Sequence, residues 1–168
     1  MNRTYLDMIQ GQEPAYTPVW FMRQAGRSQP KYREIKKTHS LFDITREPEL
    51  CAYVTNLPVD EYGLDAAILY KDIMSPMAAI GEEVKLIPGK GPVFERPIQR
   101  AADLDQIGTF DGSKVSYIAD TIKLLTSEVL DVPLIGFCGG PFTIASYLVE
   151  GGPTKSYNKT RGLMVSQA

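Results

Sequence analysis

Two arginines four positions apart, Arg23 and Arg27, are the most chemically informative residues of this sequence, and Lys31 and Arg33 follow them closely. A guanidinium group is a planar fork of donors that binds carboxylates bidentately, so this cluster suits a ligand with several carboxylates or phosphates. The alternative is a solvated surface, where isolated charges are usually found. The apolar run 19–22 precedes the cluster and predicts a strand that delivers the arginines at its C-terminal end.

Asp72 is a second candidate, because it closely follows the apolar run 66–70. An unbroken apolar run bounded by polar residues is typical of a strand buried on both faces of a parallel sheet. In barrels and open α/β sheets, the carboxyl ends of such strands form the rim where active sites are built. A carboxylate at this position is therefore a candidate site residue. The alternative is that Asp72 caps the short segment 73–80.

The elements that would position these residues alternate between strands and helices. A third buried strand is predicted at 134–138, after the clearest amphipathic helix, 113–130. Gly139, Gly140 and Pro141 then open a helix that runs towards Glu150. Other predicted elements are helices at 2–10, 30–37, 48–62 and from about residue 155, and a hairpin of strands 84–87 and 93–94. This order predicts an α/β fold with parallel strands.

Two of these helices carry a stripe of residues predicted to face the core. In helix 113–130 the stripe consists of Val115, Ile118, Ile122, Leu125 and Val129. In helix 48–62 it includes Leu50, Tyr53, Val54 and Leu57.

Composition and charge exclude several classes of function. The formal net charge of -2 provides no basic field for nucleic acid or for an anionic membrane. His39, Cys51 and Cys138 are the only histidine and cysteines, and their spacing fits no zinc or iron site. Two isolated cysteines without a secretory signal predict a reducing cytoplasm. Glycines and a proline interrupt the uncharged stretch 132–149, so it predicts a strand, a turn and a helix rather than a membrane span.

Length leaves two architectures open. A chain of 168 residues with 43% hydrophobic residues can form one domain with its own core. About three strands cannot close an eight-stranded barrel, which typically needs about 250 residues. The sequence therefore predicts either a small complete α/β domain or the front part of a larger barrel.

Four stretches of the sequence together resemble the uroporphyrinogen decarboxylase family. They are 18–27 (PVWFMRQAGR), 66–72 (AAILYKD), 88–92 (PGKGP) and 140–152 (GPFTIASYLVEGG). They occur in the order and spacing of that family over nearly the whole chain. Four motifs in register are far more specific than the arginine motif alone.

This resemblance implies a fold and an activity. The fold would be a (β/α)₈ TIM barrel roughly twice as long as this chain. Residues 1–168 would then form the amino-terminal half of one barrel domain, with a hairpin on its rim. The family is homodimeric, uses no cofactor and no metal, and removes carbon dioxide from the four acetate side chains of uroporphyrinogen III. The product, coproporphyrinogen III, serves haem biosynthesis, and no nucleic acid or membrane partner is implied.

The resemblance also implies roles for individual residues. Asp72 would accept hydrogen bonds from the pyrrole N–H groups and favour the ring cation that develops during the reaction. Arg23 and Arg27 would bind substrate carboxylates, because a guanidinium gives up a proton very reluctantly. Tyr147 would bind or position the substrate. Further residues in segments that would line the pocket are Gln24, Ala25, Ile68, Tyr70 and Gly140.

Some residues depart from the family pattern, and two alternatives remain. The departures are Ser28 and Gln29, Lys71, and the turn 138–140, all of them expected on the rim. A related barrel that transfers methyl groups from methylated cofactors such as cobalamin to thiols would need a zinc site of histidine and cysteine. The other alternative is an inactive fragment, since an open half-barrel exposes unpaired strand edges.

Overall fold

The structure is a computed structural model that describes residues 2–22, 25–87 and 89–166. Two of the predicted site residues, Arg23 and Gln24, lie outside the described residues. The chain divides into two compact units. Unit 1 comprises Met1–Asp72 and Ser116–Phe137, and unit 2 comprises Ile73–Val115 and Cys138–Ala168. Each unit has its own apolar core.

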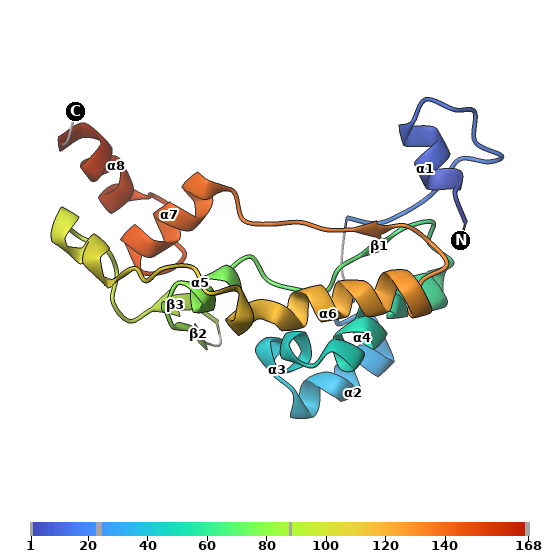
Figure 1. Cartoon of the computed structure of the whole chain (residues 1–168), viewed down its shortest axis with the longest axis horizontal. Helices are drawn as coiled ribbons and strands as arrows, with labels where there is room; N and C mark the ends of the chain where they lie inside the picture. The colour runs from blue at the N-terminus through green and yellow to red at the C-terminus, as the bar shows by residue number, and fades with distance from the viewer. Residues whose placement is uncertain (1, 23–24, 88, 167–168) are drawn as a thin grey trace. The chain divides into compact units, whose positions relative to one another are not determined.

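Unit 1 consists mainly of helices around one short parallel strand pair (Figure 1). Its helices are α1 (Thr4–Ile9), α2 (Pro30–Thr38), α3 (Leu41–Arg46), α4 (Pro48–Tyr62) and α6 (Ser116–Leu124), which continues as a π-helical turn, Leu125–Val129. Its strands are β1 (Ala67–Ile68) and β4 (Leu134–Ile135).

The parallel pairing of β1 with β4 confirms the predicted α/β class. Ala67 pairs with Leu134, and Ile68 pairs with Ile135. The segment around β1 is buried as predicted, since Ala66, Leu69 and Tyr70 are each no more than 3% exposed. The chain therefore folds here as strand, helix and parallel strand, the arrangement that places two carboxyl ends side by side.

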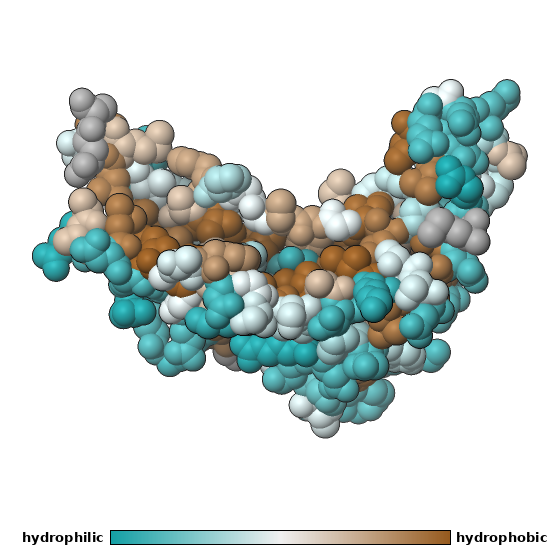
Figure 2. All heavy atoms as spheres, in the orientation of Figure 1, coloured by the Kyte–Doolittle hydropathy of each residue, from teal (hydrophilic) through white to brown (hydrophobic). Residues whose placement is uncertain are grey.

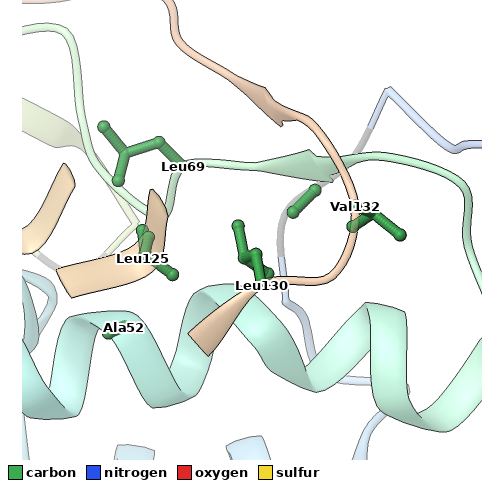
Figure 3. Close-up of a cluster of buried hydrophobic side chains, with 6 residues drawn as sticks. Ala52, Leu69, Leu125, Leu130 and Val132 are labelled. Carbon is green, nitrogen blue, oxygen red and sulfur yellow. The ribbon is translucent and has the colours of Figure 1, made fainter. Parts of the chain in front are cut away.

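A cluster of aliphatic side chains fixes β1 and β4 to the helices of unit 1. Helices α4 and α6 pack against each other (Figure 1). Figure 3 shows Leu125 and Leu130 between helix α4, which contributes Ala52, and the chain of β1. Burial of each such leucine stabilises the fold by about 1.5–3 kcal/mol. The position of the strand ends thus depends on this apolar packing.

Helix α4 has clear end signals. Pro48 lies in its first turn, where the missing N–H costs no hydrogen bond, and Gly63 ends it in the left-handed conformation at φ 64°. Val54 and Leu57 are buried as predicted. Tyr53 was predicted to face the core, and that prediction is wrong, because its side chain is 46% exposed.

The predicted helix 113–130 is also corrected in detail. Its middle is helix α6, but its last turn, Leu125–Val129, is π-helical. Ile122, predicted to face the core, is 38% exposed, whereas Thr121 is 1% exposed. The Thr121 hydroxyl can be buried because it donates to the Tyr117 carbonyl at 2.7 Å.

The predicted strand 19–22 is not present. Val19, Phe21 and Met22 are exposed by 51%, 55% and 87%. Val19 is held by Asp65, whose backbone N–H donates to the Val19 carbonyl at 2.9 Å and whose carboxylate accepts from the Val19 N–H at 2.7 Å. Both bonds join Val19 to the single residue Asp65, which precedes β1. A strand would need backbone hydrogen bonds that continue along several residues.

Unit 2 combines a hairpin with short helices. Strands β2 (Val84–Ile87) and β3 (Gly91–Phe94) pair antiparallel, with Val84 opposite Phe94, which confirms the predicted hairpin. The helices are α5 (Pro76–Ala79), α7 (Pro141–Glu150) and α8 (Asn158–Ser166), with 3-10 turns at Ala101–Gln106 and Gly112–Val115. A Cβ added at Gly139 would clash with the side chain of Ile144, which would have to shift to make room for it.

Hydropathy differs between the helices at the surface. Figure 2 shows hydrophilic residues over α2 and α3, and hydrophobic residues at the surface around α7. Phe142 of α7 and Val165 of α8 are exposed by 63% and 81%. Within the described part of the chain, no helix is long and apolar enough to cross a membrane.

Candidate functional site

A pocket of about 700 Å³ lies at the strand ends of unit 1. Its described lining residues are Trp20, Met22, Ala25, Gly26, Arg27, Tyr32, Ile68, Ile135 and Phe137. Ile68 and Ile135 are the last residues of β1 and β4. The pocket therefore occupies the edge at which α/β folds build their sites.

The loop that carries Arg27 is held by a buried glutamine. Gln29 is 1% exposed, and its Oε1 accepts a hydrogen bond from the Gly26 N–H at 3.1 Å. Its Nε2 donates to Glu61 Oε2 on α4 at 3.0 Å. Both ends of the Gln29 amide thus have hydrogen-bond partners, so its burial leaves neither of these polar atoms unpaired. The two bonds also fix the loop to α4.

A second arginine supports the same loop from the backbone side. Arg33 Nη1 on α2 donates to the Arg27 carbonyl at 3.0 Å and to the Ser28 carbonyl at 3.3 Å. The sequence groups Arg33 with the ligand-binding cluster, but this guanidinium binds the chain itself. Arg27 is exposed, and among the described lining residues it is the charged one.

Two tyrosines meet at the wall of the pocket. Tyr32 on α2 lines the pocket, and its hydroxyl lies 2.8 Å from that of Tyr70, which follows β1. Burial, followed by the hydrogen bond with Tyr32, raises the pKa of Tyr70 above its ordinary value. Tyr70 therefore remains a neutral phenol at physiological pH.

Asp72 follows Tyr70 at the end of unit 1 and is half-buried. It is not one of the described residues that line the pocket. The helix of the next segment is α5, and its N-cap position is occupied by Ser75 rather than by Asp72. Asp72 thus keeps its predicted place just beyond the buried strand, and the alternative that it caps segment 73–80 stays open.

Gly140 and Tyr147 belong to unit 2. Gly140 is the N-cap residue of α7, and its carbonyl accepts from the Ile144 N–H at 3.0 Å. Tyr147 is half-buried and packs against a core cluster that includes Phe94 and Leu148. Their predicted contact with a substrate stays a prediction.

The structure brings together three of the predicted pocket residues, Ala25, Arg27 and Ile68. Sequence reasoning missed others. Trp20 and Met22 lie inside the first motif, in the run that predicts a strand, and the motif is the one sequence signal that points to them. For Tyr32 and Gln29 the sequence offers no comparable signal, because their partners Tyr70 and Glu61 are far along the chain.

The possible metal ligands of the chain, its His, Cys, Asp and Glu side chains, are scattered over the described residues. Within residues 2–22, 25–87 and 89–166, no group of three His, Cys, Asp or Glu side chains could hold a metal ion. Cys51 is buried and its thiol donates to the Tyr70 carbonyl at 3.1 Å, whereas Cys138 is exposed. A zinc site needs about four such ligands around one point.

Comparison with known proteins decides the family. The family profile described as "Uroporphyrinogen decarboxylase (URO-D)" matches residues 1–168. The chain belongs to the uroporphyrinogen decarboxylase family. Proteins named "Uroporphyrinogen decarboxylase" from Staphylococcus aureus strains JH9 and Newman are each 60% identical to it over 164 residues. Those residues are 97% of this chain and 48% of each relative, so the chain spans about half the length of the curated relatives it matches.

Membership of the uroporphyrinogen decarboxylase family confirms the resemblance predicted from the four motifs. Among solved structures, one titled "methyltransferase from Methanosarcina mazei" aligns with a TM-score of 0.67 at 21% identity. The alignment covers 99% of this chain and 48% of that one. At this identity the likeness concerns the fold alone, so the arrangement of helices and strands seen here also occurs as half of a longer protein.

Proposed function

We propose that this chain is the amino-terminal half of a uroporphyrinogen decarboxylase, a carboxy-lyase that converts uroporphyrinogen III to coproporphyrinogen III. The observation that carries the proposal is the 60% identity to proteins of that name over 97% of the chain. The complete domain would be a TIM barrel in which both units belong to one domain, and 1–168 would supply its first strands and a rim hairpin.

The reaction needs an electron sink for each acetate that loses carbon dioxide. Protonation of a pyrrole ring makes a transient cation, and the electron pair of the breaking C–C bond flows into it as carbon dioxide leaves. A proton then adds to the former acetate carbon to give a methyl group, and the ring proton is lost. Because the protonated pyrrole ring of the substrate accepts the electron pair, the proposed reaction includes no cofactor and no metal.

Asp72 is the residue proposed to favour the ring cation. A carboxylate fixed in a largely dry site stabilises a developing positive charge and accepts hydrogen bonds from pyrrole N–H groups. The half-burial of Asp72 just beyond the buried strand supports this role. Tyr147 and Gly140, from unit 2, are proposed to contact the substrate as well.

The pocket of unit 1 supports the choice of substrate. Its walls are mostly apolar, from side chains such as Ile68, Ile135 and Phe137, and they suit the face of a tetrapyrrole. Arg27 adds a cation for one of the eight carboxylates that uroporphyrinogen carries. Arg23, Gln24 and Ala25 are proposed to act beside it, in the same motif.

Two further features complete the proposal. The complete enzyme is proposed to be a cytoplasmic homodimer, with neither nucleic acid nor a membrane as partner. The proposed catalyst is the complete enzyme rather than the 168-residue chain by itself, since residues beyond the amino-terminal half would complete the barrel and its pocket.

The test is anaerobic decarboxylation of uroporphyrinogen III, with products separated by their number of carboxylates. It compares the 168-residue chain with a chimera that continues into the carboxy-terminal half of the Staphylococcus aureus relative. Coproporphyrinogen formed only by the chimera would mark this chain as half of an enzyme. Its formation by both would mean that the half-chain assembles a working site, and its absence from both, with the relative active in parallel, would overturn the proposal.

A further inference from the structure

The Tyr32 and Tyr70 pair joins a pocket wall to the buried core. Their hydroxyls lie 2.8 Å apart, and their rings meet edge to face with centroids 5.8 Å apart. Tyr32 is half-buried and lines the pocket, whereas Tyr70 is 2% exposed. The buried phenol of Tyr70 is therefore hydrogen-bonded to the phenol of Tyr32, which lines the pocket.

Tyr70 is anchored independently of Tyr32. Its backbone N–H donates to Thr55 Oγ1 at 3.0 Å, and its carbonyl accepts from the Cys51 thiol at 3.1 Å. Both partners lie on helix α4. The backbone of Tyr70 is therefore held in place by helix α4. Because the pKa of Tyr70 is raised, its hydroxyl keeps its proton at neutral pH and can donate it in a hydrogen bond.

The direction of the hydrogen bond between the two hydroxyls depends on what occupies the pocket. Each phenol can donate one proton and can also accept. A carboxylate can only accept, so its arrival beside Tyr32 selects the arrangement in which Tyr70 donates to Tyr32 and Tyr32 donates to the carboxylate. Bonds in such a chain polarise and strengthen one another.

We propose that the Tyr32 hydroxyl is a specificity-determining contact for an acetate carboxylate of the substrate, and that Tyr70 is the positioning residue behind it. This inference rests on the proposed function. Tyr32 supplies a neutral donor that is distinct from the charge of Arg27, on a wall where Ile68 and Phe137 have no donor. After decarboxylation the acetate is a methyl group and the contact is lost, so the site favours substrate over product.

The chain contains its own reporter for a test. Trp20 is the single tryptophan of the sequence and lines the same pocket. The 168-residue chain is titrated with uroporphyrin III, which has eight carboxylates, and with coproporphyrin III, which has four, while the fluorescence of Trp20 is followed. The variants are Tyr32→Phe, Tyr70→Phe and the double variant. Tyr53→Phe is the matched control, because this phenol is 46% exposed on α4 and does not line the pocket.

Removal of a hydrogen bond to a charged group is expected to weaken uroporphyrin binding about tenfold in Tyr32→Phe, with less than a twofold change for coproporphyrin. Tyr70→Phe should weaken uroporphyrin binding about threefold and should add nothing when Tyr32→Phe is already present. A merely structural role of Tyr70 would instead give equal losses in both backgrounds and for both porphyrins. Tyr53→Phe should bind like the unmodified chain.

Each contrary result has its own meaning. Equal losses for both porphyrins in Tyr32→Phe, or no loss, would overturn this inference and leave the proposed function intact. If urea titrations show that Tyr70→Phe is not folded, Tyr32→Phe still decides whether the Tyr32 hydroxyl contacts an acetate carboxylate. If neither porphyrin changes the Trp20 fluorescence of the unmodified chain, the pocket of unit 1 does not bind a tetrapyrrole by itself, which overturns this inference for the 168-residue chain and leaves the proposed function to the decarboxylation test.

Discussion

Gln29 Nε2 donates a hydrogen bond to Glu61 Oε2 at 3.0 Å, so the loop before α2 is tied to the end of α4. The other end of the same amide accepts from the Gly26 N–H. Gly26 and Arg27 both line the pocket. A single buried side chain thus connects the position of Arg27 to a helix that also supports β1 through the apolar core.

Replacing Gln29 with leucine is expected to lower the free energy of unfolding by about 1–3 kcal/mol. The leucine fills a similar volume but leaves the Gly26 N–H and one Glu61 oxygen without these partners. Urea unfolding of the 168-residue chain measures the change. Gln12→Leu is the control, since Gln12 is exposed in the same unit. Equal stability of the two variants would mean that the amide contacts contribute nothing net.

Several helices could be predicted from sequence because their end signals are local. Pro48 and Gly63 delimit α4, and Gly140 with Pro141 opens α7, within a few residues of the helix in each case. The strand predicted at 19–22 failed for the opposite reason. An apolar run becomes a strand only if another strand pairs with it, and composition alone does not reveal the partner.

The candidate site could be predicted only in part, for a related reason. The motif 18–27 and the apolar run before Asp72 pointed to the strand ends, where the pocket is found. The hydrogen bond between Tyr32 and Tyr70 spans 38 positions, and that between Gln29 and Glu61 spans 32. Contacts over such separations follow from packing of α2 and α4 around the core, which local patterns do not encode.

Arg27→Ala is expected to weaken uroporphyrin III binding to the 168-residue chain about tenfold or more, with little change in stability. Its guanidinium is exposed at the pocket, so its loss removes a charged donor without opening a cavity in the core. Fluorescence titration through Trp20 gives the affinity, and urea unfolding gives the stability. Lys31→Ala removes a neighbouring exposed charge that does not line the pocket, and should bind normally. An equal loss of affinity in Arg27→Ala and Lys31→Ala would contradict a specific contact, because it would mean that the positive charges attract uroporphyrin without a defined position.

Arg27→Lys separates charge from geometry at the same position. Lysine keeps the positive charge but lacks the planar fork that binds a carboxylate bidentately. Affinity between that of Arg27→Ala and that of the unmodified chain is expected. Full recovery with lysine would contradict bidentate binding.

Asp72→Asn is expected to abolish most turnover in the chimera with the Staphylococcus aureus half, while the protein still folds. The amide has nearly the same shape but carries no charge to favour the ring cation, so kcat should fall by about 100-fold or more while KM changes little. Coproporphyrinogen formation under anaerobic conditions measures both constants. Asp60→Asn, at an exposed position of α4, is the control and should keep normal turnover. Near-normal turnover of Asp72→Asn would remove Asp72 from the proposed chemistry.

The two cysteines are expected to differ sharply in reactivity. Burial raises the pKa of the Cys51 thiol to about 11, although hydrogen bonds with Thr121 and Thr55 act in the opposite direction. At pH 8 a thiol reagent should therefore modify exposed Cys138 rapidly and Cys51 only after unfolding. Counting modified thiols in native buffer and in urea tests this, and Cys138→Ser should show no fast phase. Rapid modification of two thiols in native buffer would contradict the burial of Cys51.

The same thiol should make stability depend on pH in the alkaline range. The folded state holds the Cys51 proton up to about pH 11, whereas the unfolded chain releases it near its ordinary pKa of 9.0. Between these values the folded state binds more protons, so the free energy of unfolding falls as pH rises from about 9 to about 11. Urea unfolding across this range should show a steeper decline for the unmodified chain than for Cys51→Ala, because the variant has no thiol to ionise. Parallel declines would mean that Cys51 titrates alike in both states.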